Sequence, residues 1–410
     1  MKCRHCGEPL TETLVDLGSA PPSNAYLTAQ KLKQPEKWFP LRVLVCGHCR
    51  LVQTEDFADA GELFDAEYAY FSGFSTSWLA HCERYADAMQ ARFGLREGSY
   101  IVEVATNDGS LLSFFRDRHI RSLGIEPTAS TAAVARSRGL DIVEAFFGAT
   151  LAASLVGRGV RANLMVANNV LAHVPDINDF VAGFTTLLAD QGVATFEFPH
   201  LLNLVRKHQF DTIYHEHYSY LSLLAVERIF SANGLVVFDV EELPTHGGSL
   251  RVFAQRAASG RHAVTAAVER LRAVEADAGM DTPAFYRDFQ AVAESVKDDF
   301  LRFLLQARQD RKTVAAYGAA AKGNTLINFA GIRQDLIAFV ADRNPYKQGR
   351  FLPGSRIPIV SEERLREVRP DYVVLLPWNL CDELVGQLAY VADWGGCFVT
   401  AVPSLQVHNS

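Results

Sequence analysis

The stretch YIVEVATNDGS, residues 100–110, decides the fold of this 410-residue chain. An apolar run typical of a buried strand, Tyr100–Val104, leads into a turn of small residues and then into a helical pattern at Leu111–Arg118. Such a turn lets the backbone approach a ligand and leaves N–H groups free at the helix N-terminus. Glu126 ends the next apolar run, where a carboxylate can accept hydrogen bonds from the ribose hydroxyls of an adenosine. The stretch therefore predicts a ligand-binding α/β sheet.

Short apolar runs alternate with helical patterns on the C-terminal side of this stretch. The further strands are expected at Ser122–Glu126, Ala162–Ala167 and Val193–Phe198, with helices at Thr131–Arg138 and Asn178–Ala189, and a closing strand pair at Leu235–Val240 and Ser249–Ala254. Alternation of this kind predicts a doubly wound α/β sheet, with ligands at the carboxyl ends of its strands.

The pattern restarts in the last third of the chain. Residues 257–310 are rich in alanine and charge and predict two helices. A second, Rossmann-like α/β domain is then expected, with strands at Thr313–Tyr317, Leu336–Ala341, Tyr372–Leu376 and Cys397–Ala401 and a helix at Gly323–Phe329. We expect three domains, namely residues 1–68, 69–260 with a leading helix, and 261–410.

Composition and charge exclude several classes of protein. Hydrophobic residues make up 49% of the chain, which indicates a folded globular protein. A net charge of -7 without a basic patch argues against a nucleic-acid binder. The sequence contains neither an apolar run long enough to span a membrane nor an N-terminal signal peptide. We expect a cytoplasmic enzyme, active as a monomer or a weak homodimer.

Four of the seven cysteines form two Cys-x-x-Cys pairs near the N-terminus: Cys3 with Cys6, and Cys46 with Cys49. Two such knuckles supply the four thiolates that a tetrahedral zinc ion prefers. Residues 1–68 show little apolar periodicity, so we expect a structural zinc to hold a segment that lacks a core. An odd cysteine total without an export signal disfavours disulfides, and redox use would need a thioredoxin-like surrounding.

The turn after the first strand separates two cofactor classes. A dinucleotide fingerprint requires G-x-G-x-x-G, whereas this turn contains only Gly109 and places Asn107 and Asp108 where a pyrophosphate would lie. S-adenosylmethionine instead carries a sulfonium and an ammonium, which an acidic surrounding of Glu103 and Asp108 favours. The residues thus favour S-adenosylmethionine over a nicotinamide cofactor.

Two polar segments follow later strands of the sheet. Asn169 and His173 come after the strand at Ala162–Ala167, and Tyr214–Tyr220 reads YHEHYSY. A metal site at His215, Glu216 and His217 would need a sharp chain turn, because consecutive side chains point apart. A hydrogen-bonded polar cluster without chemistry is the other alternative.

The sequence closely resembles the sugar C-methyltransferases of antibiotic and surface-polysaccharide pathways, including C-3'-methyltransferases. The matching segments are the four cysteines, Tyr68–Ser72, Glu103–Gly109, Asn169–His173, Tyr214–Tyr220, Thr245–Ser249 and Tyr317–Asn324. They run in order across nearly the whole chain. The sequence departs from the family at Ala105, where many methyltransferases have glycine, and at Phe71-Ser72-Gly73, where relatives often have two consecutive serines.

The resemblance implies a class I methyltransferase sheet, with S-adenosylmethionine and one structural Zn2+ as cofactors. It also implies a nucleotide-linked 4-keto sugar as the substrate, with dTDP as the expected nucleotide. A sugar carbon can lose a proton to a base only when it lies next to a carbonyl. Methylation is therefore expected at the carbon next to the ketone, C-3 in preference to C-5. The implied catalytic residues are His217 as the base, with Glu216, Tyr214 and Tyr68 beside it. The implied cofactor residues are Glu103, Ala105, Asn107, Asp108, Gly109, Glu126, Asn169 and His173, and the implied sugar-binding residues are Tyr70, His246, Gly247, Lys322 and Asn324.

Three alternatives remain on the sequence alone. The protein could methylate oxygen or nitrogen of a sugar, which needs no ketone. It could be a nicotinamide-dependent oxidoreductase built on the C-terminal domain, although that domain's Tyr317–Gly323 turn is poor in glycine. It could also be a zinc-ribbon scaffold, which the net charge disfavours.

Overall fold

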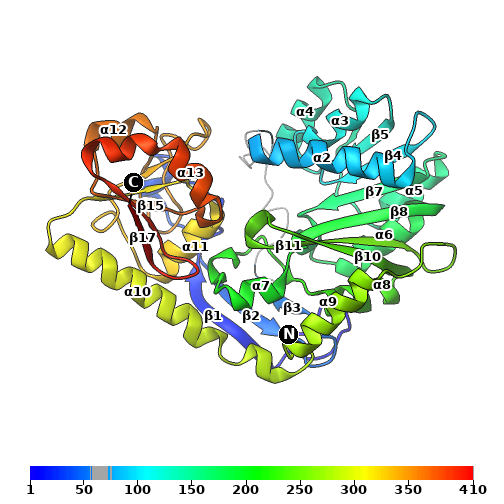
Figure 1. The fold of residues 1–410 in the computed structure, drawn as a ribbon, viewed down its shortest axis with the longest axis horizontal. Coiled ribbons are helices and arrows are strands. Elements are labelled where there is room, and N and C mark those ends of the chain that lie inside the picture. The colour runs from blue at the N-terminus through cyan, green and yellow to red at the C-terminus, as the bar shows by residue number, and fades with distance from the viewer. Residues whose placement is uncertain (56, 58–72, 74–75, 410) are drawn as a thin grey trace.

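The protein was analysed as a computed structural model that describes residues 1–55, 57, 73 and 76–409. Two α/β lobes form the arms of a V, and an antiparallel sheet with a long helix joins them at its base (Figure 1). Within the described residues, none of the helices has both the length and the apolar character needed to cross a membrane.

The central lobe contains a seven-stranded sheet in the order β10-β11-β8-β7-β4-β5-β6. Its strands are β4 (Tyr100–Val104), β5 (Arg121–Ile125), β6 (Ile142–Val143), β7 (Ala162–Asn168), β8 (Leu188–Pro199), β10 (Leu235–Leu243) and β11 (Ser249–Arg256). Its helices are α2 (Thr76–Phe93), α3 (Ser110–Asp117), α4 (Ala129–Ser137), α5 (Ala149–Gly157), α6 (Ile177–Leu187), α7 (Leu201–Arg206) and α8 (Leu223–Ala232). The sheet is parallel from β6 to β8, and β11 and β10 close it antiparallel.

This lobe confirms the predicted doubly wound sheet. Each predicted strand lies within a few residues of its observed bounds, because helices cover both faces and both faces of each parallel strand are therefore apolar. Leu164, Met165 and Val166 of β7, for example, are all fully buried.

The C-terminal lobe contains a six-stranded sheet in the order β14-β13-β12-β15-β16-β17. The elements are β12 (Val314–Tyr317), α11 (Ala321–Phe329), β13 (Val340–Ala341), β14 (Ile359–Val360), α12 (Glu363–Val368), β15 (Tyr372–Leu375), α13 (Cys381–Gln387), β16 (Cys397–Thr400) and β17 (Gln406–Asn409). All pairs are parallel except β16 with β17. The predicted strand at Leu336–Ala341 is reduced to its last two residues.

The base of the V is an antiparallel sheet in the order β1-β2-β3-β9. It consists of β1 (Glu12–Ala20), β2 (Phe39–Val45) and β3 (Val52–Thr54), with β9 (Ser219–Tyr220) contributed by the central part of the chain. Helices α9 (Ala266–Asp277) and α10 (Phe289–Gln309) are the two helices predicted for residues 257–310.

The expectation that residues 1–68 lack a core is wrong for the part of this segment that the structure describes. Val15 and Val43 are fully buried and belong to one apolar cluster with Phe300 of α10 and Val340 of the C-terminal lobe. Irregular spacing in β1 hides the pattern, because its register with β2 shifts twice.

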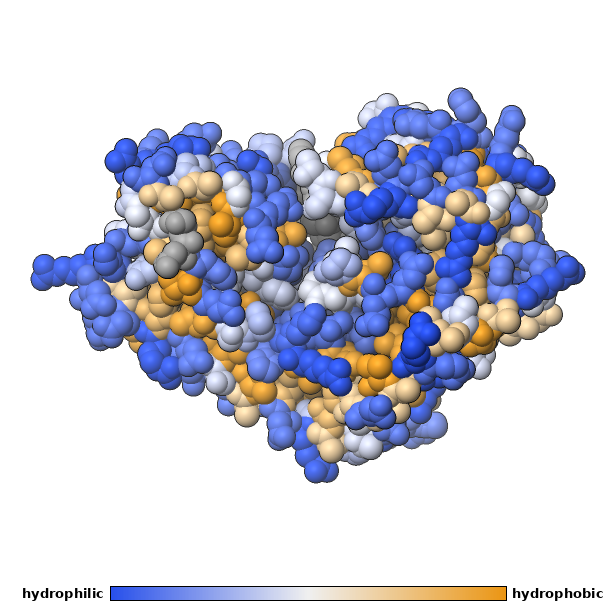
Figure 2. Space-filling view, in the orientation of Figure 1, coloured by the Kyte–Doolittle hydropathy of each residue, from blue (hydrophilic) through white to orange (hydrophobic). Residues whose placement is uncertain are grey.

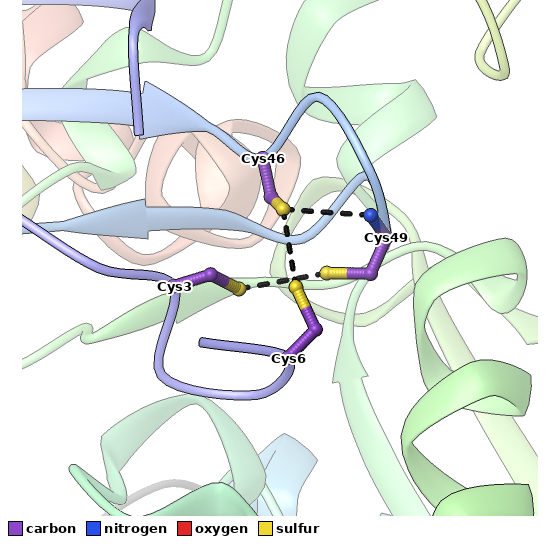
Figure 3. A group of neighbouring side chains, drawn as sticks. All are labelled: Cys3, Cys6, Cys46 and Cys49. Atoms are coloured by element: carbon purple, nitrogen blue, oxygen red, sulfur yellow. Dashed lines mark hydrogen bonds between the residues drawn. The ribbon is translucent and has the colours of Figure 1, made fainter. Parts of the chain in front are cut away.

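The four paired cysteines converge beside this sheet (Figure 3). Their Sγ atoms all lie within 4.8 Å of one another, and Sγ–Sγ distances are 3.5 Å for Cys3 to Cys49 and for Cys6 to Cys46. None of the four forms a disulfide. A zinc ion with four Zn–S bonds of about 2.3 Å separates its sulfurs by about 3.8 Å, so the donor set and spacing fit tetrahedral zinc.

We expect Cys46→Ser to lose zinc and to unfold at a lower temperature than the unmodified protein, because a structural metal stabilises the fold around it. Elemental analysis and thermal unfolding measure the two effects. Cys397→Ser, far from the cluster, is the matched control and should keep one zinc per chain. Full zinc content and stability in Cys46→Ser would contradict the assignment.

Candidate functional site

A cavity of about 390 Å³ opens between the two lobes, at the carboxyl ends of β4, β5 and β7. Figure 2 shows the hollow between the lobes from one side. Residues of all three parts of the chain line the cavity, including Asn24 from the N-terminal part, the turn after β4, and Lys322 from α11. The carboxyl end of a parallel sheet is where such folds bind ligands.

The turn after β4 and the end of β5 form one wall of the cavity. Ala105 and Asn107 line it with positive φ angles of 57° and 55°. The Glu126 carboxylate accepts hydrogen bonds from the backbone N–H groups of Asn107 at 2.8 Å and Thr128 at 2.9 Å. These bonds hold the carboxylate at the cavity wall, where its remaining lone pairs can accept from ligand hydroxyls.

Glu103 supplies an unpaired buried carboxylate in the same wall. Glu103 is 6% exposed, and its Oε2 has no hydrogen-bond partner among the residues that the structure describes. Burial, together with Asp108 and Glu126 nearby, raises the pKa of Glu103 well above its ordinary value. A cationic ligand would relieve this cost, so the wall fits the ammonium or sulfonium of S-adenosylmethionine.

Two predicted cofactor residues shape the turn and do not line the cavity. Asp108 accepts hydrogen bonds from the Ser110 hydroxyl at 2.6 Å and the Gly73 N–H at 2.9 Å. Gly109 has a φ of 77°, and a Cβ there would lie 2.3 Å from Leu140. Only glycine therefore fits between the turn and the residues before β6.

Two histidines meet at the centre of the cavity. His217 Nδ1 lies 3.0 Å from the Thr212 carbonyl oxygen, and His173 Nδ1 lies 2.7 Å from the Glu216 carbonyl oxygen. A carbonyl only accepts, so both Nδ1 atoms donate and each neutral ring keeps its lone pair on Nε2. Their ring centroids are 4.6 Å apart. Two α-helices and a strand, namely α6, β8 and α7, separate these two residues along the chain, and the fold brings them together.

Burial keeps these imidazoles neutral. It lowers the pKa of His173 to about 4 and lowers that of His217 well below 6.5, with a further contribution to His217 from His173. Burial also lowers the pKa of His246, a third cavity histidine, to about 4. The cavity therefore offers unprotonated nitrogens at neutral pH.

The neighbours of His217 in the sequence have different environments. Tyr214 lines the cavity, with its ring tilted over His217 at a centroid distance of 4.0 Å. Glu216 does not line it, and its Oε1 accepts from the N–H and side-chain amide of Asn24, both at 3.2 Å. His215 Nε2 points to the carbonyl of Pro40 at 3.2 Å. Only Tyr214 and His217 of this segment therefore face the ligand space together.

The predicted sugar-binding residues divide in the same way. His246 and Lys322 line the cavity, as does Asn169, a predicted cofactor residue directly after β7. The Gly247 carbonyl accepts from Gln209, and Asn324 is 1% exposed and donates to the Ser23 carbonyl at 2.6 Å. These two residues support the walls without lining them. Tyr68 and Tyr70 lie outside the described residues.

The structure also adds residues to the site that sequence reasoning missed. Asn24, Trp78 and Lys347 line the cavity. The Trp78 ring stacks on His81, whose Nε2 lies 2.8 Å from Glu197 of β8. Asn24, Trp78 and Lys347 do not stand in a recognisable motif. For the support behind Trp78, the available signal in the sequence is the position of Glu197 near the end of a predicted strand.

A buried ion pair supports the wall behind Trp78. Arg251 Nη2 lies 2.5 Å from Glu197 Oε1, and both side chains are almost fully buried. Burial raises the pKa of Glu197, but His81 and Arg251 outweigh this effect and the pKa is lowered. The carboxylate is thus ionised and ties β8, β11 and α2 together.

Comparison with known proteins gives matches along the chain. Three family models match it: "Putative zinc binding domain" at residues 3–64, "Methyltransferase domain" at 78–240 and "C-methyltransferase C-terminal domain" at 244–403. C-methyltransferase NovU of Streptomyces niveus is 36% identical over 406 residues, covering 99% of this chain and 96% of that protein.

Two similar solved structures each cover 43% of this chain. Magnesium protoporphyrin IX methyltransferase of Synechocystis with bound S-adenosylmethionine is 14% identical, covers 43% of this chain and 79% of its own, and has a TM-score of 0.34. An S-adenosylmethionine-dependent methyltransferase of Clostridium acetobutylicum is 10% identical, covers 43% and 92%, and has a TM-score of 0.35. At these TM-scores, neither similarity indicates a function for this chain.

The full-length relative and the three family models together decide between the classes left open by the sequence. They argue against the nicotinamide oxidoreductase and the zinc-ribbon scaffold. The chain therefore belongs to the C-methyltransferase family, as an S-adenosylmethionine-dependent enzyme with an N-terminal zinc-binding domain.

Proposed function

We propose that the enzyme methylates the carbon beside the ketone of a nucleotide-linked 4-keto sugar, with His217 as the general base. The observation that carries this proposal is the hydrogen bond from His217 Nδ1 to the Thr212 carbonyl at 3.0 Å. It assigns the lone pair to Nε2 on a ring that lines the same cavity as the turn after β4. A base and a methyl-donor wall in one cavity are what C-methylation requires.

The chemistry of the chain's own residues follows from this placement. His217 takes the proton from the sugar carbon, and the electron pair of the C–H bond enters the carbonyl to form an enolate. S-adenosylmethionine, when bound, supplies the electrophilic methyl group. Tyr214, tilted over His217, donates a hydrogen bond to the enolate oxygen. The enolate carbon would then form the new C–C bond while the methyl–sulfur bond of the bound donor breaks, which restores the carbonyl and leaves S-adenosylhomocysteine.

The C-terminal lobe supplies positive charge for the sugar nucleotide. Lys322 and Lys347 line the cavity beside Ala320 and Ala321, at the N-terminus of α11. A helix N-terminus with two nearby ammonium groups favours phosphate oxygens. We propose that these groups hold the diphosphate of the substrate and that His246 contacts the sugar.

Glu126→Ala should weaken S-adenosylmethionine binding by roughly 1.5–3 kcal/mol, the scale of a hydrogen bond to a charged group. We propose that the Glu126 carboxylate holds the ribose hydroxyls, and calorimetry measures the affinity. Glu144→Ala is a matched control, because Glu144 pairs with exposed Arg136 on the same side of the sheet. Equal affinities for Glu126→Ala and the unmodified enzyme would place the ribose elsewhere.

His217→Asn should bind both ligands almost normally and lose methyl transfer by about 10²-fold or more, as expected for loss of a general base. It should also stop the exchange of the sugar proton with deuterium when S-adenosylhomocysteine replaces the methyl donor. Exchange at C-3 and at C-5 is observed separately, so the same assay identifies the carbon.

The matched control for this variant is His215→Asn, because His215 faces backbone carbonyls away from the cavity. It should keep exchange. Continued exchange in His217→Asn would move the base to Tyr214 or Tyr68. Methylation of a substrate that has no keto group would instead favour transfer to oxygen or nitrogen.

The pH dependence of methyl transfer should reflect the lowered pKa of His217. Because the folded enzyme holds this imidazole unprotonated below pH 6.5, the acid limb of kcat/KM should lie below pH 6.5. Initial rates over a pH series measure it, with a return to neutral pH as a control for irreversible zinc loss. An acid limb at or above pH 6.5 would contradict the role of a buried neutral base.

A further inference from the structure

The segment that carries His217 is held by the zinc-binding part of the chain as well as by the central lobe. Strand β9 follows His217 almost directly and pairs antiparallel with β3, with Val52 opposite Tyr220 and Gln53 opposite Ser219. The Thr54 N–H donates to the Tyr218 carbonyl at 3.1 Å. The sheet that carries the second cysteine knuckle therefore continues into the catalytic segment.

Thr54 contacts His217 itself. Its hydroxyl donates to the His217 carbonyl oxygen at 3.1 Å, and its side chain is 3% exposed. His217 is thus held at two points, at its carbonyl by Thr54 and at its ring by the Thr212 carbonyl. Together these bonds restrict both the backbone and the side-chain torsions of the proposed base.

Arg4, inside the first knuckle, links the cysteine cluster to the same place. Its Nη2 donates to the Thr54 carbonyl at 2.9 Å, and its Nη1 donates to the Pro175 carbonyl at 3.0 Å. Its guanidinium lies 5.2 Å from the centre of the Tyr218 ring. One side chain therefore joins β3, the loop after β7 that carries His173, and the residue next to His217.

The backbone of Arg4 is held in turn by the cluster's surroundings. Its N–H donates to Gln53 Oε1 at 2.9 Å, and Gln53 Nε2 lies 3.3 Å from the sulfur of Cys3. Gln53 is fully buried. A continuous path of hydrogen bonds thus runs from a cysteine sulfur through Gln53, Arg4 and Thr54 to the backbone of His217.

We propose that Arg4 and Thr54 are positioning residues, through which the ordered cysteine cluster fixes the orientation of the His217 imidazole. This inference rests on the proposed role of His217. It assigns the N-terminal domain a part in the active site beyond that of holding its own fold. A buried group that is held by several hydrogen bonds keeps one geometry, so it does not have to reorganise during the reaction.

The test compares Thr54→Val and Arg4→Met with two matched controls. Thr54→Val is isosteric and removes one hydroxyl donor. Its control is Thr185→Val, which removes a hydroxyl that donates to the Asn233 carbonyl at 2.7 Å, outside the cavity. The control for Arg4→Met is Arg50→Met, because Arg50 follows the second knuckle and donates to the Asp281 carbonyl, away from His217.

We expect Thr54→Val to lower kcat by about 3- to 10-fold, the range for one lost hydrogen bond, with KM and S-adenosylmethionine affinity unchanged. Arg4→Met should lower kcat further, and both variants should keep one zinc per chain. Thr185→Val and Arg50→Met should keep the unmodified kcat. Equal losses in Arg4→Met and Arg50→Met, accompanied by zinc loss, would show that the cluster only stabilises the fold and would overturn the inference.

A second readout needs no substrate. The ¹⁵N signals of the His217 imidazole, assigned by their absence in His217→Asn, report its tautomer. Thr54→Val and Arg4→Met should shift or broaden these signals, whereas the two controls should not. Unchanged signals would overturn the inference whatever the substrate, and shifted signals without deuterium exchange in the unmodified enzyme would contradict only the proposed function.

Discussion

The pairing of β3 with β9 is the interaction on which the rest of this structure depends. Two residue pairs join the N-terminal sheet to the segment directly after His217. The cysteine cluster closes the other end of β3, because Cys46 and Cys49 stand in the turn between β2 and β3. The proposed base is therefore held by the N-terminal sheet as well as by the central lobe, which also supplies the proposed wall for the methyl donor. The proposed active site therefore depends on the contact between these two parts of the chain.

Electrostatics divides this cavity into two halves. Glu103 and Glu126 stand on the central lobe, where a sulfonium and an ammonium would be stabilised. Lys322 and Lys347 stand on the C-terminal lobe, where phosphates would be stabilised. The neutral His217 lies with them in the same cavity. A cationic donor and an anionic acceptor would thus each have a complementary wall, with a base available for the reacting carbon.

Contacts between residues far apart in the chain hold the surroundings of His217 in place. Asn24 binds Glu216, and the Tyr26 hydroxyl donates to the Ala319 carbonyl at 2.5 Å. These bonds join the N-terminal part both to the segment that carries His217 and to the C-terminal lobe. Glu216, expected beside the base, is used in this contact between domains. His215 and Glu216 form a turn that is closed by the hydrogen bond from the His217 N–H to the Tyr214 carbonyl at 2.9 Å, so His217 faces the cavity while Glu216 points into the wall.

The sequence by itself determined the two α/β lobes, the cysteine cluster and the acidic wall around Glu103 and Glu126. Each of these depends on local spacing: buried parallel strands are continuously apolar, and a knuckle needs only two residues between its cysteines. The resemblance to a known family added the expectation that His217 is the base. Only the tertiary structure decided that residues 1–55 possess a core, that β9 joins their sheet, and that Asn24, Trp78 and Lys347 line the cavity. These features depend on contacts between residues far apart in the chain, which local periodicity does not encode.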